Sequence, residues 1–333
     1  MISSESEPFV SIVVCAHNEL NNLQKLIPLL LDQNYKKFEI ILVDDRSEDK
    51  TSEYLSKIKD KRLSVLRIDQ TPANYNPKKF ALEQGISKAS GEIILLTDGD
   101  CFPKSNNWIL AMQRNFQKGK KLVLGYSPYI KKPGLLNLFI RFETFFTAIQ
   151  YFSLALRGLP YMGVGRNMAY TKELFQQKNA FHGIAHVTGG DDDLFVQKAA
   201  TAENTTIELS SESQVFSLPK NSYPAYFRQK LRHLSAGLKY NLKSRFILGL
   251  LVVSQALFYF SLITLCIYGI TTYLLLIAFV FRTLLLIIIF AAIEKNLDED
   301  FKWWLLPILD FLYIINYITI AISTTVANKS KWN

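Results

Sequence analysis

The stretch Ile93-Ile94-Leu95-Leu96-Thr97-Asp98-Gly99-Asp100 joins an apolar run to two carboxylates. The run is typical of a buried strand, and Gly99 allows the chain to turn sharply between Asp98 and Asp100, so both side chains can reach one point beyond the strand. Mg²⁺ and Mn²⁺ prefer oxygen ligands and are commonly held by one or two carboxylates together with substrate phosphates. The stretch therefore favours a divalent-cation site, with a solvated Asp-Gly turn as the alternative.

Strands and helices alternate around this stretch. The predicted strands are Val10–Cys15, Phe38–Val43, Leu63–Ile68 and Gly91–Thr97, and the predicted helices are Leu20–Leu31 and Lys78–Ala89. Such alternation predicts an α/β fold with a mostly parallel sheet flanked by helices. Ligands bind these sheets beyond the carboxyl ends of the strands, which is where we expect the functional residues.

Polar clusters stand at three of these strand ends. Ala16-His17-Asn18-Glu19 follows the first strand, Asp44-Asp45-Arg46-Ser47 follows the second, and Asp98-Gly99-Asp100 follows the fourth. Taken alone, Asn18 or Asp45 could simply cap the helix that comes next. Three acceptor-rich clusters at one edge of a sheet favour a shared ligand site instead.

A fourth cluster, Gly189-Gly190-Asp191-Asp192-Asp193-Leu194, lies further along the chain. In this order the four clusters resemble the successive signatures of family 2 glycosyltransferases, over a match that runs from about Pro8 to Tyr240. The resemblance implies the GT-A nucleotide-diphospho-sugar transferase fold. It also implies an inverting glycosyltransferase that uses a nucleotide-diphosphate sugar, either a UDP- or a GDP-sugar, together with Mg²⁺ or Mn²⁺.

The resemblance also implies a role for each matching residue. The donor would be bound by Ala16, Asn18, Glu19, Asp45, Lys78, Asp98, Gln229 and Arg232, and the metal by Asp98 and Asp100. Glu19 and Asp45 would contact the base and the ribose. His233 stands where the family has Trp after the matching Gln229 and Arg232, which puts an aromatic contact with the acceptor or the donor sugar in doubt.

The acidic triplet supplies the predicted general base. By the spacing to Leu194 that the resemblance implies, this base is Asp191, with Asp192 as the rival. A carboxylate within hydrogen-bond reach of an acceptor hydroxyl can take its proton as the new bond forms. Repulsion among three consecutive acids is expected to raise their pKa values and so to strengthen the base. Stabilising the start of the next helix is the alternative role, for at least one of the three.

Charge is unevenly distributed over the 333 residues. Nearly all of it lies before about residue 240, which predicts a soluble catalytic domain over 1–240 and a membrane domain over 241–333. The net charge of +9 is dispersed and includes Lys239, Lys243 and Arg245, so it favours anionic membrane lipids over nucleic acid. The few cysteines are unpatterned and imply neither a disulfide framework nor a zinc site.

Long apolar runs fill the C-terminal region. The runs at 246–269 and 271–293, joined by a tight turn at Ile270, are long enough to cross a hydrocarbon core of about 30 Å. The run at 304–327 is a third candidate, but it contains polar residues, so an interfacial or re-entrant helix is the alternative. Arg282 is expected to pair with Asp310, or else with a phosphate of the acceptor.

The flanking charges predict the orientation in the membrane. Cations lie in the segment before the first run, and Lys295 and Lys302 lie in the loop after the second. This positive charge predicts that the segment and the loop are both cytosolic. Met1–Pro8 lacks the basic start and apolar core of a signal peptide. We therefore expect an integral membrane protein whose catalytic domain faces the cytosol, at a bacterial inner membrane.

The run Gly134–Arg157 is apolar but carries Arg141, Glu143 and Gln150. If it crossed the membrane, it would separate Asp100 from the acidic triplet that we place in the same site. We therefore expect 134–157 to form an amphipathic helix at the membrane surface, with a buried core helix as the alternative.

These features favour transfer of a sugar to a membrane-associated acceptor, either lipid-linked or a glycan. Two other functions are kept as alternatives: a processive polysaccharide synthase, and a membrane scaffold that binds nucleotide without catalysis. A non-catalytic scaffold needs no general base, so the presence of the acidic triplet disfavours this alternative. The sequence leaves the sugar, the base of the donor and the oligomeric state open.

Overall fold

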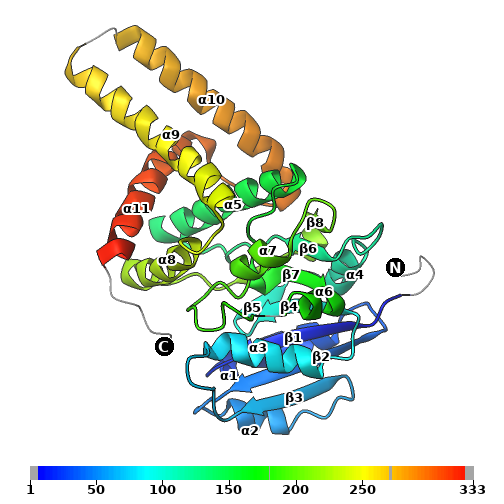
Figure 1. Ribbon diagram of the computed structural model, residues 1–333. Helices are drawn as coiled ribbons and strands as arrows, with labels where there is room; N and C mark the ends of the chain where they lie inside the picture. Colours follow the sequence, from blue (N-terminus) through cyan, green and yellow to red (C-terminus); the bar gives the residue numbers. More distant parts are fainter. Residues whose placement is uncertain (1–6, 180, 270–271, 327–333) are drawn as a thin grey trace.

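The computed structural model describes residues 7–179, 181–269 and 272–326. Most of the segment Met1–Pro8 and the predicted turn at Ile270 therefore lie outside the described residues. Within these ranges, an α/β head that ends near Tyr240 is followed by three long helices, coloured yellow to red in Figure 1.

The head is built on a seven-stranded sheet in the order β3-β2-β1-β4-β7-β6-β8. Its strands are β1 (Val10–Ala16), β2 (Phe38–Asp45), β3 (Leu63–Ile68), β4 (Ile93–Asp98), β6 (Leu122–Gly125), β7 (Met168–Thr171) and β8 (Thr205–Glu208). Only β7 is antiparallel to its neighbours. A separate ribbon pairs β5 (Cys101–Pro103) with β9 (Val215–Ser217). The predicted mostly parallel sheet is confirmed.

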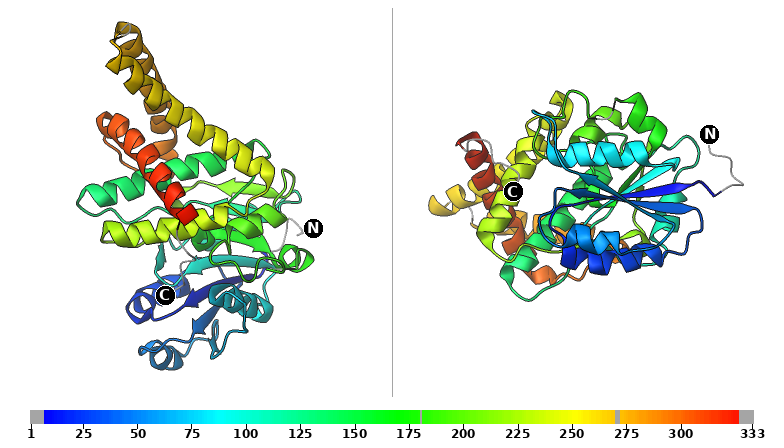
Figure 2. Two further views of the ribbon diagram at one scale, coloured as in Figure 1. Left: turned by 60° about the vertical axis from the view of Figure 1, so that its left-hand side comes forward. Right: turned by 90° about the horizontal axis from the view of Figure 1, so that it is seen from below.

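Helices flank both faces of this sheet (Figures 1 and 2). Those of the head are α1 (Leu20–Leu31), α2 (Thr51–Ser56), α3 (Pro77–Lys88), α4 (Trp108–Gln113), α5 (Leu135–Leu156), α6 (Lys172–Gln177), α7 (Asp193–Ala199) and α8 (Tyr223–Gly237). Single 3₁₀ turns are η1 (Gly165–Asn167), η2 (Ser211–Ser213) and η3 (Trp303–Leu305). The predicted helices α1 and α3 and the first four strands occupy nearly the residues expected.

Alternation along the strands produces two apolar layers. In β1, Ile12 and Val14 pack under α1 and α4, whereas Val13 points to the opposite face under α3, α5, α6 and α7. α3 can approach the sheet closely because Gly85 has no side chain. A Cβ at this position would lie only 2.8 Å from Val13 Cγ1 and from Val43 Cγ2. This packing fixes the N-terminal end of α3 beside the carboxyl ends of the strands.

α5 corresponds to the apolar run predicted as a helix over 134–157. One of its faces is buried and includes Arg141, Phe142 and Phe145, whereas Leu135 and Leu156 at its two ends are exposed. Phe145 packs edge-on against Phe290, with ring centroids 5.6 Å apart. α5 thus lies between the head and the C-terminal helices, and its position at a membrane surface stays a prediction.

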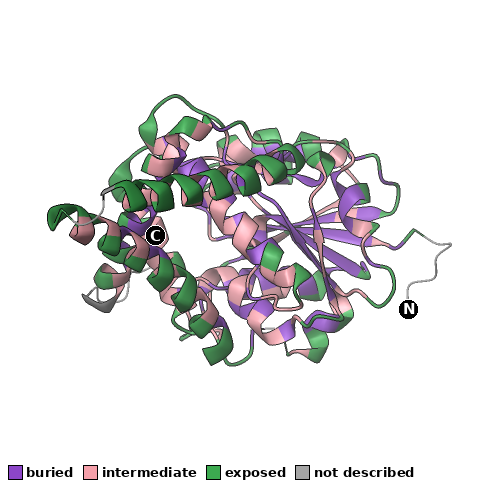
Figure 3. Ribbon diagram, turned by 90° about the horizontal axis from the view of Figure 1, so that it is seen from above, coloured by how far each residue is buried: buried purple, intermediate pink, exposed green. Residues whose placement is uncertain are grey.

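Three C-terminal helices are long and apolar enough to cross a membrane: α9 (Leu242–Ile267), α10 (Thr272–Leu297) and α11 (Leu306–Val326). α9 and α10 lie side by side and project away from the head (Figures 1 and 2). α11 instead packs along α8, and 39 % of its most apolar 18-residue stretch is buried, against 6 % for that of α10. Figure 3 shows the largely exposed surface of the long helices beside the buried sheet. The third predicted span is therefore held by the head more closely than the other two.

The predicted pairing of Arg282 with Asp310 is confirmed, because the two side chains form an ion pair between α10 and α11. Asp310 also accepts hydrogen bonds from Gln255 Nε2 at 2.7 Å and from the Tyr259 hydroxyl at 2.6 Å, both on α9. Arg282 further lies over the ring of Phe258, 4.8 Å from its centroid. One buried polar cluster thus joins all three helices.

Acidic residues that follow α10 attach the long helices to the head. Glu299 accepts a hydrogen bond from Arg141 at 2.5 Å and another from the Tyr126 hydroxyl at 2.7 Å. Asp300 also pairs with Arg141, at 2.7 Å, and with Lys131. The start of α9 and the end of α10 therefore lie on the side of the head, and the far ends of both helices point away from it.

Candidate active site

A cavity of about 510 Å³ opens at the carboxyl ends of β1, β2 and β4. It is lined by every residue that the sequence proposed for the site: Ala16, Asn18, Glu19, Asp45, Lys78, Asp98, Asp100, Asp191, Asp192, Gln229 and Arg232. The β1, β2 and β4 ends supply one wall, and α8 and the loop before α7 supply the opposite one. The structure thus brings together residues that are far apart in the chain.

Lys78, at the start of α3, lies between two of these acids. Its Nζ is 2.9 Å from Asp98 Oδ1 and 3.0 Å from Asp191 Oδ2, and its side chain is only 18 % exposed. Burial lowers the pKa of Lys78, but the two carboxylates raise it by more, so the ammonium stays charged. A single cation therefore bridges the predicted metal-binding strand end and the predicted base.

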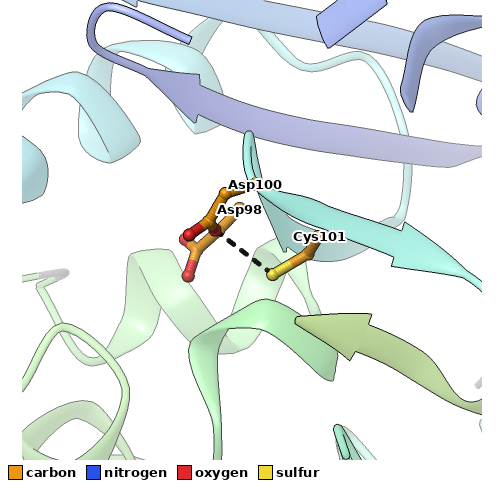
Figure 4. Close-up of side chains that lie close together, drawn as sticks. All are labelled: Asp98, Asp100 and Cys101. Atoms are coloured by element: carbon orange, nitrogen blue, oxygen red, sulfur yellow. Dashed lines mark hydrogen bonds between the residues drawn. The ribbon is translucent and has the colours of Figure 1, made fainter. Parts of the chain in front are cut away.

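Asp98 and Asp100 converge at the end of β4, with the thiol of Cys101 beside them (Figure 4). One ligand atom from each of the three residues lies within 4.8 Å of the others. Cys101 Sγ is 3.4 Å from Asp100 Oδ1, and burial raises the pKa of the thiol well above its usual value, so it is protonated. The available ligands are therefore two carboxylates, a set that fits a hard divalent cation such as Mg²⁺ or Mn²⁺.

The three acids at the start of α7 have different surroundings. Asp192 accepts backbone N–H groups from Gly165 and Asp193, both at 2.8 Å, and is the N-cap of α7. Asp193 accepts the hydroxyl of Tyr240 at 2.6 Å. Asp191 forms a salt bridge of 3.0 Å with Lys78. The capping role expected for one member of the triplet thus falls to Asp192.

The expectation that all three acids have raised pKa values is wrong for Asp191. Burial raises its pKa, but the Lys78 ammonium, backbone hydrogen bonding and the charge of Lys79 together lower it by more, so the pKa lies below its usual value. Burial, followed by the charge of Asp191, raises the pKa of Asp192; burial and the charge of Asp192 hold that of Asp193 well above its usual range. A lysine that is distant in sequence overrides the repulsion within the triplet.

Asn18 connects the loop that follows β1 to the loop that follows β2, beside the predicted site for the base and the ribose. It has a left-handed backbone with φ +56°, and its Oδ1 accepts the backbone N–H of Glu48 at 2.8 Å. Its own N–H donates to Ser47 Oγ at 2.9 Å. Since the N-cap of α1 is Glu19, which makes no side-chain capping bond, the alternative role of Asn18 as a helix cap is wrong. Asp45 does not cap α2 either, because Lys50 is the N-cap there.

Glu19 and Asp45 complete this side of the cavity. Burial raises the pKa of Glu19, which accepts the amide of Asn22 at 2.5 Å. Asp45 is buried and forms a salt bridge of 2.8 Å with the adjacent Arg46. Both residues keep polar oxygens at the cavity wall.

On the opposite wall, α8 carries Gln229, Arg232 and His233. Gln229 Nε2 donates to the Tyr129 hydroxyl at 3.2 Å. Burial, with added repulsion from Lys230 and Arg232, lowers the pKa of His233 well below its usual value, so the imidazole is neutral at pH 7. The residue that stands where the resemblance implies Trp is thus an uncharged aromatic ring within the same cavity.

Two cations that the sequence did not single out support the site. Arg166, on η1, lines the cavity, donates from Nε to Ser127 Oγ at 2.7 Å, and has its guanidinium 4.9 Å from the centroid of the Tyr129 ring. Gly163 and Gly165, which flank this position, also line the cavity, but nothing in the sequence indicates that the Arg166 side chain points inward.

Lys79 is the other unexpected residue. Its side chain is completely buried, and Nζ donates to the carbonyl oxygens of Ile184, Val187 and Gly189 at 2.9, 2.7 and 2.7 Å. Burial lowers the pKa of Lys79 to about 8. Lys79 therefore ties the loop before Asp191 to α3, whereas the adjacent Lys78 reaches into the cavity.

Known proteins resemble this chain in sequence. The glycosyltransferase AglE of Haloferax volcanii is 34 % identical over 100 residues, which are 29 % of this chain and 32 % of that protein. The Escherichia coli protein WfaP, a UDP-Glc:alpha-D-GlcNAc-diphosphoundecaprenol beta-1,3-glucosyltransferase, is 29 % identical over 123 residues, or 36 % of this chain and 45 % of that one. The matches span less than half the length of either relative.

A solved structure resembles the whole described architecture. The mannosyltransferase PcManGT of Pyrobaculum calidifontis, in complex with GDP-Man and Mn²⁺, matches with a TM-score of 0.59 and 16 % identity, over 96 % of this chain and 88 % of that chain. At this identity the likeness concerns the fold, which is the predicted GT-A fold followed by apolar helices. The family described as glycosyl transferase family 2 matches residues 11–177. On this match and on the ordered strand-end clusters of one cavity, the chain belongs to glycosyl transferase family 2.

Proposed function

We propose that this protein is an inverting, metal-dependent glycosyltransferase that moves a sugar from a nucleotide-diphosphate sugar to a membrane-associated acceptor. The observation that carries the proposal is the convergence of Asp98, Asp100 and Asp191 on one cavity, with Lys78 between them. A cation-binding pair on one side of a cavity and a carboxylate on the other are the groups that displacement of a diphosphate by a hydroxyl requires.

The donor would lie between the strand ends and α8. Asn18, Glu19 and Asp45 line the part of the cavity assigned to the base and ribose, and Asp98 and Asp100 would hold Mg²⁺ or Mn²⁺. When bound, that cation would neutralise negative charge on the diphosphate. Lys78 and Arg232 from the chain itself add positive charge at the same place, and Arg166 lies beside them.

Asp191 would act as the general base. As the acceptor oxygen forms its bond to C1 of the sugar, the hydroxyl proton passes to Asp191 and the C1–O bond to the diphosphate breaks, with its electron pair leaving on the diphosphate. Because attack and departure occur on opposite faces of C1, the configuration is inverted. Asp192 is the weaker candidate, since both of its carboxylate oxygens already accept backbone N–H groups.

The membrane supplies the acceptor in this proposal. We assign 1–240 to a cytosolic catalytic domain and 241–333 to a membrane domain of a bacterial inner membrane protein. The three apolar helices support this assignment, and the relative WfaP has a diphosphoundecaprenol acceptor in its name. A lipid-linked or other amphiphilic acceptor would explain why a transferase head is attached to such helices.

The test is a donor screen with the purified full-length protein. UDP- and GDP-sugars are supplied with Mn²⁺, Mg²⁺ or excess chelator, and release of nucleotide diphosphate is measured with and without a membrane lipid extract. We expect one donor to be consumed in a metal-dependent way, faster with extract, and the D191N variant to lose the extract-stimulated part. Metal-independent turnover, or full stimulation of D191N, would contradict the proposal.

A further inference from the structure

A second cavity of about 310 Å³ lies between α5, α8, α9 and α11. It shares Met162, Asp193 and His233 with the lining of the active-site cavity. The two cavities are therefore neighbours that meet behind the acidic triplet. One faces the strand ends, and the other faces the helices that are apolar enough to cross a membrane.

The second cavity is polar at the end that lies nearer the head. Lys230 lines it and forms a salt bridge of 2.6 Å with Glu143, and Arg245 lines it from the first turn of α9. Among the residues that the structure describes, Arg245 forms no ion pair, and its side chain is exposed. Two acids also line the cavity: Glu143 is paired with Lys230, and Asp193 accepts the Tyr240 hydroxyl and has a pKa well above its usual range, raised first by burial. The Arg245 guanidinium therefore gives the lining an excess of positive charge that suits an anionic group.

The other end of the cavity is apolar. Leu248 and Val252 on α9 face Tyr317 and Ile320 on α11 across it. Gly249 leaves the wall open, because a Cβ built there would meet no atom within 4 Å. An α9–α11 gap of this kind can take a hydrocarbon chain directly from the bilayer.

We propose that this second cavity is the acceptor site and that it takes a lipid with a phosphate between its hydrocarbon chain and its sugar-accepting hydroxyl. The phosphate lies at Arg245 and Lys230, the chain lies between α9 and α11, and the hydroxyl passes His233 to reach Asp191. This inference rests on the proposed function. It adds the place where the acceptor binds and the requirement for an anionic group near the start of α9.

The order of the groups along the cavities supports this occupant. A neutral lipid would leave Arg245 without a counter-charge, and a soluble glycan would leave the apolar gap between α9 and α11 empty. The phosphate-bearing lipid matches both ends. Entry from the bilayer also leaves the mouth at the strand ends to the donor.

The experiment measures binding directly, with the full-length protein in phosphatidylcholine nanodiscs. The probe is a photoactivatable isoprenyl phosphate, and the adducts are mapped by mass spectrometry, with farnesyl phosphate, farnesol and inorganic phosphate as competitors. We expect adducts on residues 245–252 and 313–320 that farnesyl phosphate removes and the other two competitors do not. Labelling that is confined to other surfaces, or that farnesol removes equally well, would overturn the proposal.

Matched variants test the two ends separately. G249W fills the apolar end and is expected to reduce labelling about tenfold, whereas L250W adds bulk one residue away on the exposed side of α9 and should not. R245Q should weaken labelling about fivefold, corresponding to ~1 kcal/mol for one cation, and K243Q should leave it unchanged. Equal losses in a variant and its control would count against the site.

Failure of this inference can be told apart from failure of the proposed function. Labelling requires no sugar transfer, so the cavity is judged even if no nucleotide sugar is consumed. Binding of a fluorescent nucleotide diphosphate to each variant reports an intact head. If the donor screen succeeds and the labelling result is negative, the protein is a transferase whose acceptor binds elsewhere.

Discussion

Nζ of Lys78 lies 3.0 Å from Oδ2 of Asp191, although more than a hundred residues separate the two in the chain. The same ammonium is 2.9 Å from Asp98 Oδ1. Lys78 therefore links the side of the cavity that would hold the metal and donor to the carboxylate that would deprotonate the acceptor. A diphosphate that arrives at this place would compete for the ammonium.

Replacing this lysine should change the pH dependence of transfer. Asp191 must be ionised to act as a base, so the rate rises with pH through its pKa, which Lys78 holds low against the effect of burial. In K78Q that pKa should rise, and the acid limb of kcat should move to higher pH. The measurement is kcat against pH for K78Q and for K88Q, which removes an exposed lysine at the end of the same helix. An unmoved limb in K78Q would remove Asp191 from the role of base.

The two candidate bases should respond differently to conversion to asparagine. D191N is expected to slow transfer by about 10²- to 10⁴-fold while nucleotide binding persists. D192N should mainly lose an acceptor for one of its two backbone N–H groups, at a cost of about 1 kcal/mol in stability. Single-turnover rates and thermal unfolding distinguish the two effects. Normal transfer by D191N together with loss in D192N would make Asp192 the base.

Metal binding should depend on the carboxylates and not on the thiol beside them. D100A is expected to lose measurable Mn²⁺ binding in isothermal titration and to lose metal-dependent turnover, because it removes one of the two carboxylates proposed as ligands. C101A should retain both, since the neighbouring thiol is buried and protonated. Mn²⁺ binding that survives in D100A would place the metal elsewhere.

Lys79 should control the order of the loop before Asp191. In K79M, the carbonyl oxygens of Ile184, Val187 and Gly189 lose their common donor. Hydrogen exchange at residues 184–190 is therefore expected to speed up by about tenfold, the equivalent of one lost anchor of ~1.4 kcal/mol, with exchange in β1 unchanged. Uniform acceleration in both segments would indicate general destabilisation instead.

The ion pair between α10 and α11 should be needed for stability, and a charge swap should restore only part of it. Arg282→Gln leaves the buried Asp310 carboxylate without a counter-charge, and Asp310→Leu leaves the partly buried Arg282 guanidinium without one, so each should cost about 3 kcal/mol. In the R282D/D310R double variant the charges attract again, but an arginine at 310 cannot accept from Gln255 and Tyr259. Thermal unfolding in detergent measures all three. Additive losses in the double variant would show that the pair contributes no coupling.

Much of the secondary structure of the head could be predicted from the local pattern of apolar and polar residues. The apolar runs of β1 to β4 and the helices α1 and α3 were predicted nearly to the residue, because strand and helix periodicities are local properties of the chain. The convergence of the strand-end clusters was predicted as well, since parallel strands bring their carboxyl ends to one edge. The pair of Arg282 and Asp310 followed from the cost of leaving either charge alone in an apolar environment.

What the sequence determined by itself is therefore the set of chemical groups and the sheet edge where they meet: acceptor-rich clusters at three strand ends, an acidic triplet, and apolar helices that follow them in the chain. The tertiary structure alone decided which neighbour each group faces. It placed Lys78 against Asp191 and so lowered a pKa that repulsion within the triplet should have raised, turned Lys79 toward three carbonyls, and laid α11 along α8 to enclose a second cavity. These outcomes depend on side chains that meet across long stretches of chain, and electrostatic and packing energies act over distance in space, which local periodicity does not encode.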